Sequence, residues 1–145
     1  MDIITLSQHE YNWLRSKKNF PNEYWVSIRI ASNEAEMMRM SESHNKQFED
    51  ILNVFFTDIK EDIEVVGGTY HKYSIENHKQ IREFFHKHIN ADKLFIHCNS
   101  GRCRSTSVGH GLKLLYPNVN LQHGIDGKSS VYPYPNIVSF FTKDL

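Results

Sequence analysis

Short apolar runs alternate along the chain with longer stretches in which apolar residues recur at helical spacing. Four runs have the length of a strand: residues 3–6, 24–30, 51–56 and 93–97. The run ILNVFF at 51–56 is almost continuously apolar, which is typical of a strand buried on both faces of a parallel sheet. The alternation predicts an α/β fold with a central, mostly parallel sheet of about four to five strands flanked by helices.

Capping residues and apolar periodicity predict helices between these runs. Ser7 and Glu10 have the spacing of a capping box, so a helix is expected to begin at Ser7. A second helix is expected from about Ser74 to residues 90–92. Its apolar face would consist of Ile81, Phe84, Phe85 and Ile89. The polar stretch 33–50 suits either a surface helix or an irregular excursion.

The C-terminal part of the chain is predicted to hold two more helices. One follows the run 93–97, where apolar residues return at helical spacing. They are Val108, Leu112 and Leu115. In the last helix, Asn136 would be the N-cap and the helix would run through Phe141. The order strand, tight loop, helix around residues 97–105 matters, because ligands of open α/β sheets bind where strands end and helices begin.

Composition narrows the possible functions. A chain of 145 residues without repeats or linkers predicts one domain, residues 1–145. Seventeen basic and seventeen acidic residues cancel, which disfavours general nucleic-acid binding. The two cysteines, Cys98 and Cys103, are too few and too close for a secreted disulfide framework, so a cytoplasmic location is expected. No apolar stretch approaches the roughly 20 residues of a membrane span, so no membrane association is expected. The oligomeric state is not predicted.

The segment HCNSGRCRS at 97–105 carries the strongest candidate chemistry. A helix N-terminus and a nearby guanidinium favour the thiolate form of a cysteine, so Cys98 is expected to be a nucleophile. Gly101 permits a tight loop whose backbone N–H groups surround one tetrahedral dianion. Arg104 would bind two phosphoryl oxygens with its planar fork, and Ser105 would donate a hydrogen bond to the thiolate. The expected phosphate-binding residues are Asn99, Ser100, Gly101, Arg102, Cys103 and Arg104.

The remaining ionisable groups near this segment receive lesser roles. His97 is expected to be structural and to hydrogen-bond loop carbonyls. Arg102 is either a solvated loop tip or an extra positive charge at the pocket mouth. His86 and His88 lie two positions apart on a predicted helix and so face different directions, and no cysteine or histidine spacing matches a zinc site. Neither a metal nor another cofactor is expected.

The pattern His-Cys-(five residues)-Arg-Ser, between an apolar strand and a helix, resembles the signature of the protein tyrosine phosphatases. The resemblance is to the compact dual-specificity-like branch, with its small bacterial and phage members, and in looser form it extends over about residues 24–141. It implies that Cys98 forms a phosphocysteine intermediate and that Arg104 binds the phosphate. It also implies that an aspartate protonates the leaving alcohol and then activates water.

Two aspartates compete for the role of this acid. Asp58 follows the run 51–56 by two residues, which puts it at the expected carboxyl edge of the sheet. Asp62 follows closely, and the stretch that leads to the next predicted helix is long enough to bring it to the same place. Asp58 is the preferred candidate.

Cys103 resembles a different family. Cys-(four residues)-Cys-Arg-Ser is similar to the loop of low-molecular-weight tyrosine phosphatases, although that family carries its loop at the N-terminus. The spacing leaves two interpretations of Cys103: an inert small residue, or a thiol that traps oxidised Cys98 as a reversible disulfide.

The sequence therefore predicts an enzyme that hydrolyses phosphomonoesters, and the resemblance implies phosphotyrosine, or phosphoserine and phosphothreonine, in protein or peptide substrates. Phosphoinositide and RNA 5′-triphosphate phosphatases use similar loops, but their highly charged substrates usually require more cations than Arg102 adds. A rhodanese-like sulfurtransferase and a non-catalytic phosphate-binding pseudophosphatase are two further candidate functions.

Overall fold

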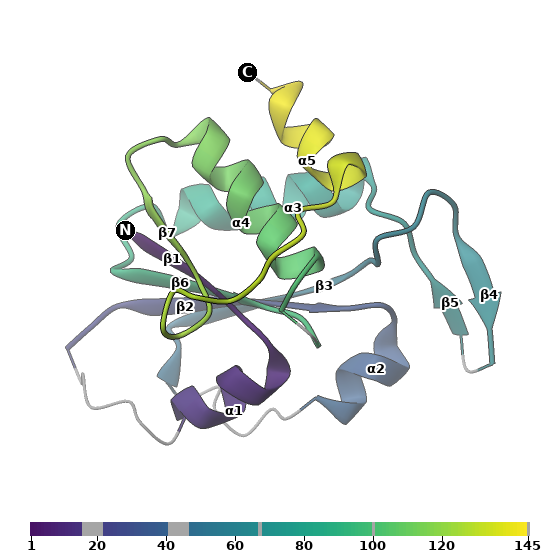
Figure 1. Ribbon diagram of the computed structural model, residues 1–145, viewed down its shortest axis with the longest axis horizontal. Coiled ribbons are helices and arrows are strands. Elements are labelled where there is room, and N and C mark those ends of the chain that lie inside the picture. Colours follow the sequence, from purple (N-terminus) through teal and green to yellow (C-terminus); the bar gives the residue numbers. More distant parts are fainter. Residues whose placement is uncertain (16–21, 41–46, 67, 100, 145) are drawn as a thin grey trace.

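A five-stranded parallel sheet forms the centre of the structure, a computed structural model that describes residues 1–15, 22–40, 47–66, 68–99 and 101–144 (Figure 1). The strands lie side by side in the order β3-β2-β6-β1-β7, and each pair is parallel. They are β1 (Asp2–Leu6), β2 (Trp25–Ala31), β3 (Asp50–Phe55), β6 (Lys93–His97) and β7 (Asn120–His123). Because β6 is the central strand, the loop that follows it emerges at the middle of the carboxyl edge. The α/β class and the parallel sheet predicted from the sequence are confirmed.

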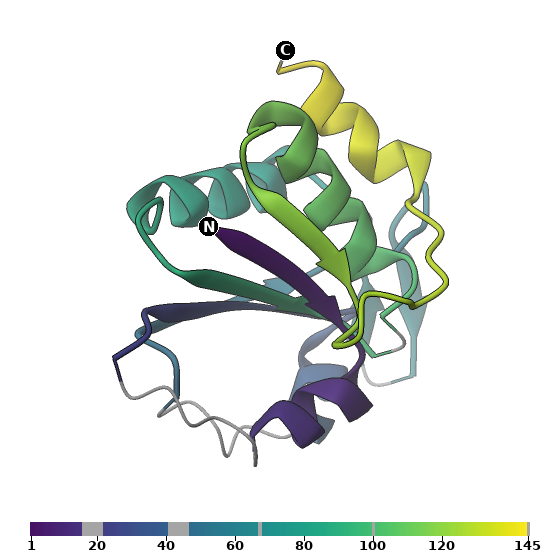
Figure 2. The same cartoon turned by 60° about the vertical axis from the view of Figure 1, so that its left-hand side comes forward.

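Helices cover both faces of the sheet (Figure 2). One face carries α1 (Gln8–Arg15) and α2 (Glu34–Arg39), and the other carries α3 (Ile75–Lys87), α4 (Arg104–Leu115) and α5 (Pro135–Thr142). In the part of the chain that the structure describes, no helix is long and apolar enough to cross a membrane.

Side-chain caps fix the starts of two helices where the sequence predicts them. The Ser7 hydroxyl accepts the N–H of Glu10 at 3.1 Å, and the Glu10 carboxylate accepts the N–H of Ser7 at 3.1 Å. Ser74 and Asn77 form the equivalent pair at the start of α3. Each pair satisfies two backbone donors that a helix leaves free at its first turn.

Apolar side chains form a core on each face of the sheet. The larger core lies under α3, α4 and α5. It includes Ile81, Phe85, Cys98, Val108 and Phe141. The smaller core lies under α1 and contains Leu6, Tyr11, Trp25, Phe48 and Phe95. Cys98 is therefore anchored in the larger core, not on a flexible excursion.

Three expectations from the sequence are wrong. Only Val54 and Phe56 are buried within 51–56, because β3 is an edge strand; β2 is buried at all seven positions instead. Ile89 lies beyond α3 and is 45% exposed, since the helix ends at Lys87. Asn136 is not the N-cap of α5: that position is Tyr134, and Pro135 takes the first helical position, which suits its fixed φ.

Two elements were not predicted. One is β7. The other is a two-stranded antiparallel hairpin formed by β4 (Ile63–Val65) and β5 (Gly68–Tyr70). It lies between β3 and α3 in the chain and projects from the body of the molecule (Figure 1). The predicted helix or excursion within 33–50 is α2, and residues 41–46 lie outside the described part of the chain.

Candidate active site

Cys98 follows β6 directly and is completely buried. Its N–H donates to the carbonyl of Leu6 at 3.3 Å, so the strand pairing with β1 fixes its backbone. Its Sγ lies 3.3 Å from the hydroxyl oxygen of Ser105 and accepts the N–H of Gly101 at 3.2 Å. The sulfur thus sits inside the loop with two hydrogen-bonding groups around it.

Gly101 is required in this loop for two reasons. Its φ of +72° belongs to the left-handed region, which residues with a Cβ rarely adopt. A Cβ at this position would also lie 2.6 Å from the backbone nitrogen of Ser7 and 2.9 Å from the carbonyl carbon of Leu6. The loop packs this closely on the β1–α1 junction, where the Asn99 carbonyl accepts the N–H of Gln8 at 3.0 Å.

The N-terminus of α4 faces the loop without a side-chain cap. Cys103 is the N-cap residue and makes no capping hydrogen bond with its side chain. The carbonyl of Arg102 accepts the N–H of Tyr132 at 2.8 Å, and that of Cys103 accepts the N–H of Ser107 at 2.9 Å. The first N–H groups of a helix have no partner within it, so this end of α4 suits an anion.

Arg104 is held by two residues that the sequence pattern did not indicate as part of the site. Its Nη1 donates to the Ser32 hydroxyl at 3.0 Å and to the Glu36 carboxylate at 3.2 Å, and the side chains of this ion pair are mostly buried. Asn33 caps α2 by accepting the N–H of Glu36 at 2.9 Å, which fixes the carboxylate in turn. The available signal was the Asn33–Glu36 capping spacing just after a strand.

Asp58 lies at the same edge of the sheet, just beyond β3. It is half-buried and accepts the Thr57 hydroxyl at 3.2 Å. Its carboxylate also acts on the loop: burial raises the pKa of the Cys103 thiol, and the negative charge of Asp58 raises it further, while Arg104 opposes the shift. The carboxylate and the loop are therefore electrostatic neighbours, although 40 positions separate Asp58 from Cys98 in the sequence.

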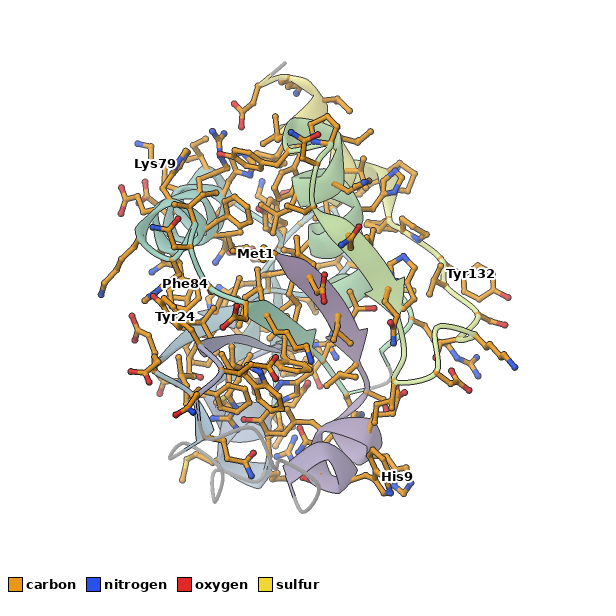
Figure 3. The ribbon with its side chains drawn as sticks, turned by 90° about the vertical axis from the view of Figure 1, so that its left-hand side faces the viewer. Met1, His9, Tyr24, Lys79, Phe84 and Tyr132 are labelled. Atoms are coloured by element: carbon orange, nitrogen blue, oxygen red, sulfur yellow. The ribbon has the colours of Figure 1, made fainter. Side chains whose placement is uncertain are left out.

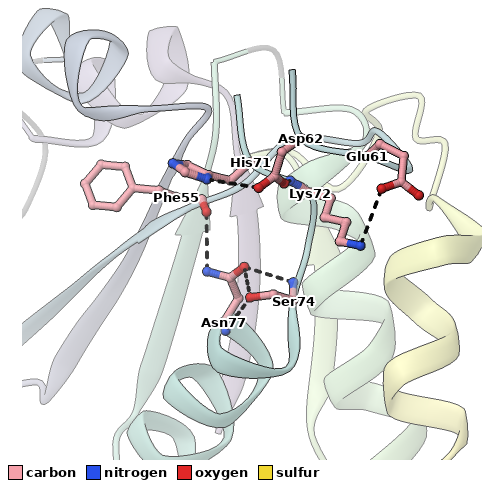
Figure 4. Close-up of polar contacts among 7 residues, drawn as sticks. All are labelled: Phe55, Glu61, Asp62, His71, Lys72, Ser74 and Asn77. Atoms are coloured by element: carbon pink, nitrogen blue, oxygen red, sulfur yellow. Dashed lines mark hydrogen bonds and ion pairs between the residues drawn. The ribbon is translucent and has the colours of Figure 1, made fainter. Parts of the chain in front are cut away.

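Asp62 is used differently (Figure 4). One of its carboxylate oxygens accepts the N–H of Lys72 at 2.9 Å, and the other lies 3.8 Å from Nδ1 of His71. These contacts join the start of the hairpin to its end. Asp62 thus lies at the base of the hairpin, and Asp58 lies just beyond β3.

The other candidate residues occupy the periphery of the site. His97 is buried, and its ring stacks on that of Tyr11 with centroids 3.9 Å apart. Arg102 is exposed at the loop tip. Cys103 is half-buried, and neither it nor Cys98 forms a disulfide. Ser100 lies outside the described residues.

Within the described residues no three histidine, cysteine, aspartate or glutamate side chains are grouped so that they could hold a metal ion.

No family model matches the chain, and no curated protein or solved structure is significantly similar to it.

Proposed function

We propose that the protein is a cysteine-dependent phosphatase that hydrolyses phosphomonoesters in phosphorylated proteins or peptides. The observation that carries this proposal is the environment of Cys98 Sγ. It lies at the uncapped N-terminus of α4, accepts the Gly101 N–H at 3.2 Å and lies 3.3 Å from the Ser105 hydroxyl. A sulfur in this environment lies beside hydrogen-bond donors and a helix N-terminus, which suit a bound phosphate.

In the first step the Cys98 thiolate attacks phosphorus, and the bond from phosphorus to the leaving oxygen breaks. Asp58 gives its proton to that oxygen, so an alcohol leaves and the phosphoryl group stays on sulfur. Arg104 stabilises the negative charge of the phosphoryl oxygens. Its Nη1 is anchored by Ser32 and Glu36, but a guanidinium has five N–H donors, and the others serve the substrate.

In the second step the Asp58 carboxylate takes a proton from water, and the resulting hydroxide attacks phosphorus. The bond from sulfur to phosphorus breaks, and the thiolate leaves with the Gly101 N–H and the Ser105 hydroxyl as hydrogen-bond donors. Inorganic phosphate departs and Asp58 is again protonated, which closes the cycle.

A sulfurtransferase and a pseudophosphatase are less well supported by the same residues. A sulfurtransferase needs neither the Arg104 anchor nor an acid at Asp58. A pseudophosphatase commonly loses the nucleophile or the arginine, and both are present here. Two unpaired thiols also fit a reducing compartment, so we place the protein in the cytoplasm.

The test is turnover of para-nitrophenyl phosphate. The wild-type protein should hydrolyse it, and Cys98→Ser should be inactive while still binding vanadate, because the loop and Arg104 remain. Transfer of sulfur from thiosulfate to cyanide by the wild type, without phosphate release, would contradict the proposal.

A further inference from the structure

A pocket of about 470 Å³ opens next to Asp58, apart from the loop that holds Cys98. Its walls come from the segment after β3, from the segment between β5 and α3, and from the first turns of α5. Most of the wall is apolar. The apolar side chains include Ile59, Ile75, Ile137 and Phe140. Ile75 is 53% exposed, so the protein itself leaves part of this apolar surface uncovered.

Two lysines, Lys60 and Lys72, also line the pocket. Lys72 reaches toward Glu61 along the side that faces α5 (Figure 4), but the two charged atoms are 3.8 Å apart and the Glu61 side chain is 84% exposed. Exposed pairs of this kind contribute little energy and are easily exchanged for another partner. The pocket thus combines an apolar wall with two cations and suits an anionic, partly apolar ligand.

Two segments of the chain connect the walls of the pocket to the proposed active site. Ile59 follows Asp58 directly in the chain. In the other segment, Tyr132 donates its N–H to the Arg102 carbonyl and Tyr134 donates its N–H to the Ser107 hydroxyl, and Asn136, two residues further on, lines the pocket. Neighbouring segments of the chain thus build the walls of the pocket and the surroundings of the loop.

We propose that this pocket is a specificity subsite that binds a phosphorylated peptide beside its phosphorylated residue, taking one apolar side chain and a neighbouring carboxylate. This inference rests on the proposed phosphatase function and adds a substrate preference to it. The apolar side chain packs on Ile75 and Phe140, and the carboxylate pairs with Lys60 or Lys72. An extended residue spans about 3.3 Å, so each step of the pair along the peptide moves it by about that distance relative to the phosphorylated residue.

The experiment compares phosphopeptides that differ only in the flanking residues. One series carries a Glu-Leu pair moved stepwise along the peptide, and a matched series carries Lys-Leu or Glu-Ser. The Glu-Leu peptide should have a kcat/KM about tenfold higher than either match at one or two positions of the pair. The Lys60→Gln/Lys72→Gln double variant and Ile75→Asp should reduce this preference to about twofold.

Control variants outside the pocket show whether the loss of the Glu-Leu preference is specific to changes in the pocket. Lys79 points outward from α3 (Figure 3), and Ile89 lies beyond the end of that helix with 45% exposure; neither lines the pocket. Lys79→Gln and Ile89→Asp should keep the full preference. Para-nitrophenyl phosphate, which has no flanking residues, reports the state of the active site in every variant, and circular dichroism reports folding.

The outcomes distinguish the two proposals. If the wild type fails to hydrolyse para-nitrophenyl phosphate, the proposed function fails. If it hydrolyses this substrate but shows no Glu-Leu preference, or a preference that survives both pocket variants, the subsite is refuted. Hydrolysis of phosphoinositide vesicles that depends on Lys60 and Lys72, with no peptide preference, would also overturn it in favour of a lipid substrate.

Discussion

Polar side chains lie at both ends of the parallel strands: at the amino edge of the sheet, where the strands begin, and at the carboxyl edge, where they end. The side chains at these two edges do different things. At the amino edge, Nε2 of His88 lies 2.8 Å from the Asp50 carboxylate, Nδ1 of His88 bonds to the Tyr24 hydroxyl, and Lys87 also reaches Asp50 at 3.1 Å. At the carboxyl edge, the Gly101 N–H and the Ser105 hydroxyl lie against the sulfur of Cys98, and Ser32 and Glu36 hold Arg104. Figure 3 shows Tyr24 on the opposite side of the molecule from Tyr132, which lies beside the loop.

The comparison teaches that titratable groups around a pocket do not by themselves make an active site. The pocket at the amino edge, about 600 Å³, is comparable in size to the one lined by Ile59. Its groups satisfy one another, however, as a structural network does. Burial alone would raise the pKa of Asp50, but hydrogen bonds from His88 and Lys87 outweigh it and lower that pKa. We therefore regard the amino edge as structural.

The largest expected effect separates the two aspartates of the carboxyl side. Asp58→Asn should lower kcat about 10²–10⁴-fold, because the leaving oxygen loses its proton donor. The basic-side fall in the pH–rate profile should disappear with it, since that fall reports the loss of the acid's proton.

The matched control is Asp62→Asn, which removes the contacts to Lys72 and His71 but not the acid. Steady-state kinetics with a phenyl phosphate, a poor leaving group, is the measurement. Equal losses in the two variants, or an unchanged profile in Asp58→Asn, would move the acid away from Asp58.

A change at Arg104 tests whether the proposed site needs a planar guanidinium or only a positive charge. Arg104→Lys keeps the charge but cannot both hold Ser32 and Glu36 and bind two phosphoryl oxygens, so kcat should fall about 10²–10³-fold. Lys87→Met removes a cation from the amino edge and should leave kcat unchanged. The same kinetic assay decides: full activity of Arg104→Lys would show that the fork is not used.

The smallest effect concerns stability at the amino edge. His88→Ala should lower the free energy of unfolding by about 1–3 kcal/mol, because it leaves the partly buried Tyr24 hydroxyl and Asp50 carboxylate without their shared partner. Urea denaturation at neutral pH measures this. Activity per folded molecule should not change; a loss of kcat would contradict the structural role of this edge.

The same network predicts a pH dependence of stability. The folded-state pKa of Asp50 is lowered, so its contribution is present above the pKa of the unfolded chain, about 4, and is lost as the pH falls through the folded value. As the pH falls below about 4, the free energy of unfolding should therefore decrease less in Asp50→Asn than in the wild type. In Glu49→Gln, a change at the neighbouring residue, it should decrease as much as in the wild type. The same pH dependence of the free energy of unfolding in the wild type and Asp50→Asn would count against the network.

The local part of the fold was predictable from the sequence because short-range signals determine it. The run 93–97 forms β6 with the predicted bounds, and the apolar spacing beyond the loop corresponds to α4. The Ser7–Glu10 capping pair forms as predicted because it acts over three residues, and α3 begins next to Ser74 as expected.

Long-range contacts were not predictable in the same way. Ser32 and Glu36 reach Arg104 across 72 and 68 positions, and only the assembled sheet brings them together. The edge position of β3 likewise depends on strand order, which the apolar run does not encode. The hairpin strands have three residues each, and β7 (NLQH) is largely polar, so neither produces a clear pattern.

In the proposed mechanism Cys98 carries the phosphoryl group between the two steps, and a chemical quench can detect it there. Asp58→Asn is mixed with para-nitrophenyl phosphate, whose good leaving group needs little acid, and the reaction is stopped in acid within the first turnover. Peptide mass spectrometry should find one phosphoryl group on Cys98, accumulated because its hydrolysis lacks the base. Release of nitrophenol with an unmodified Cys98, or with the phosphoryl group on another residue, would contradict the account.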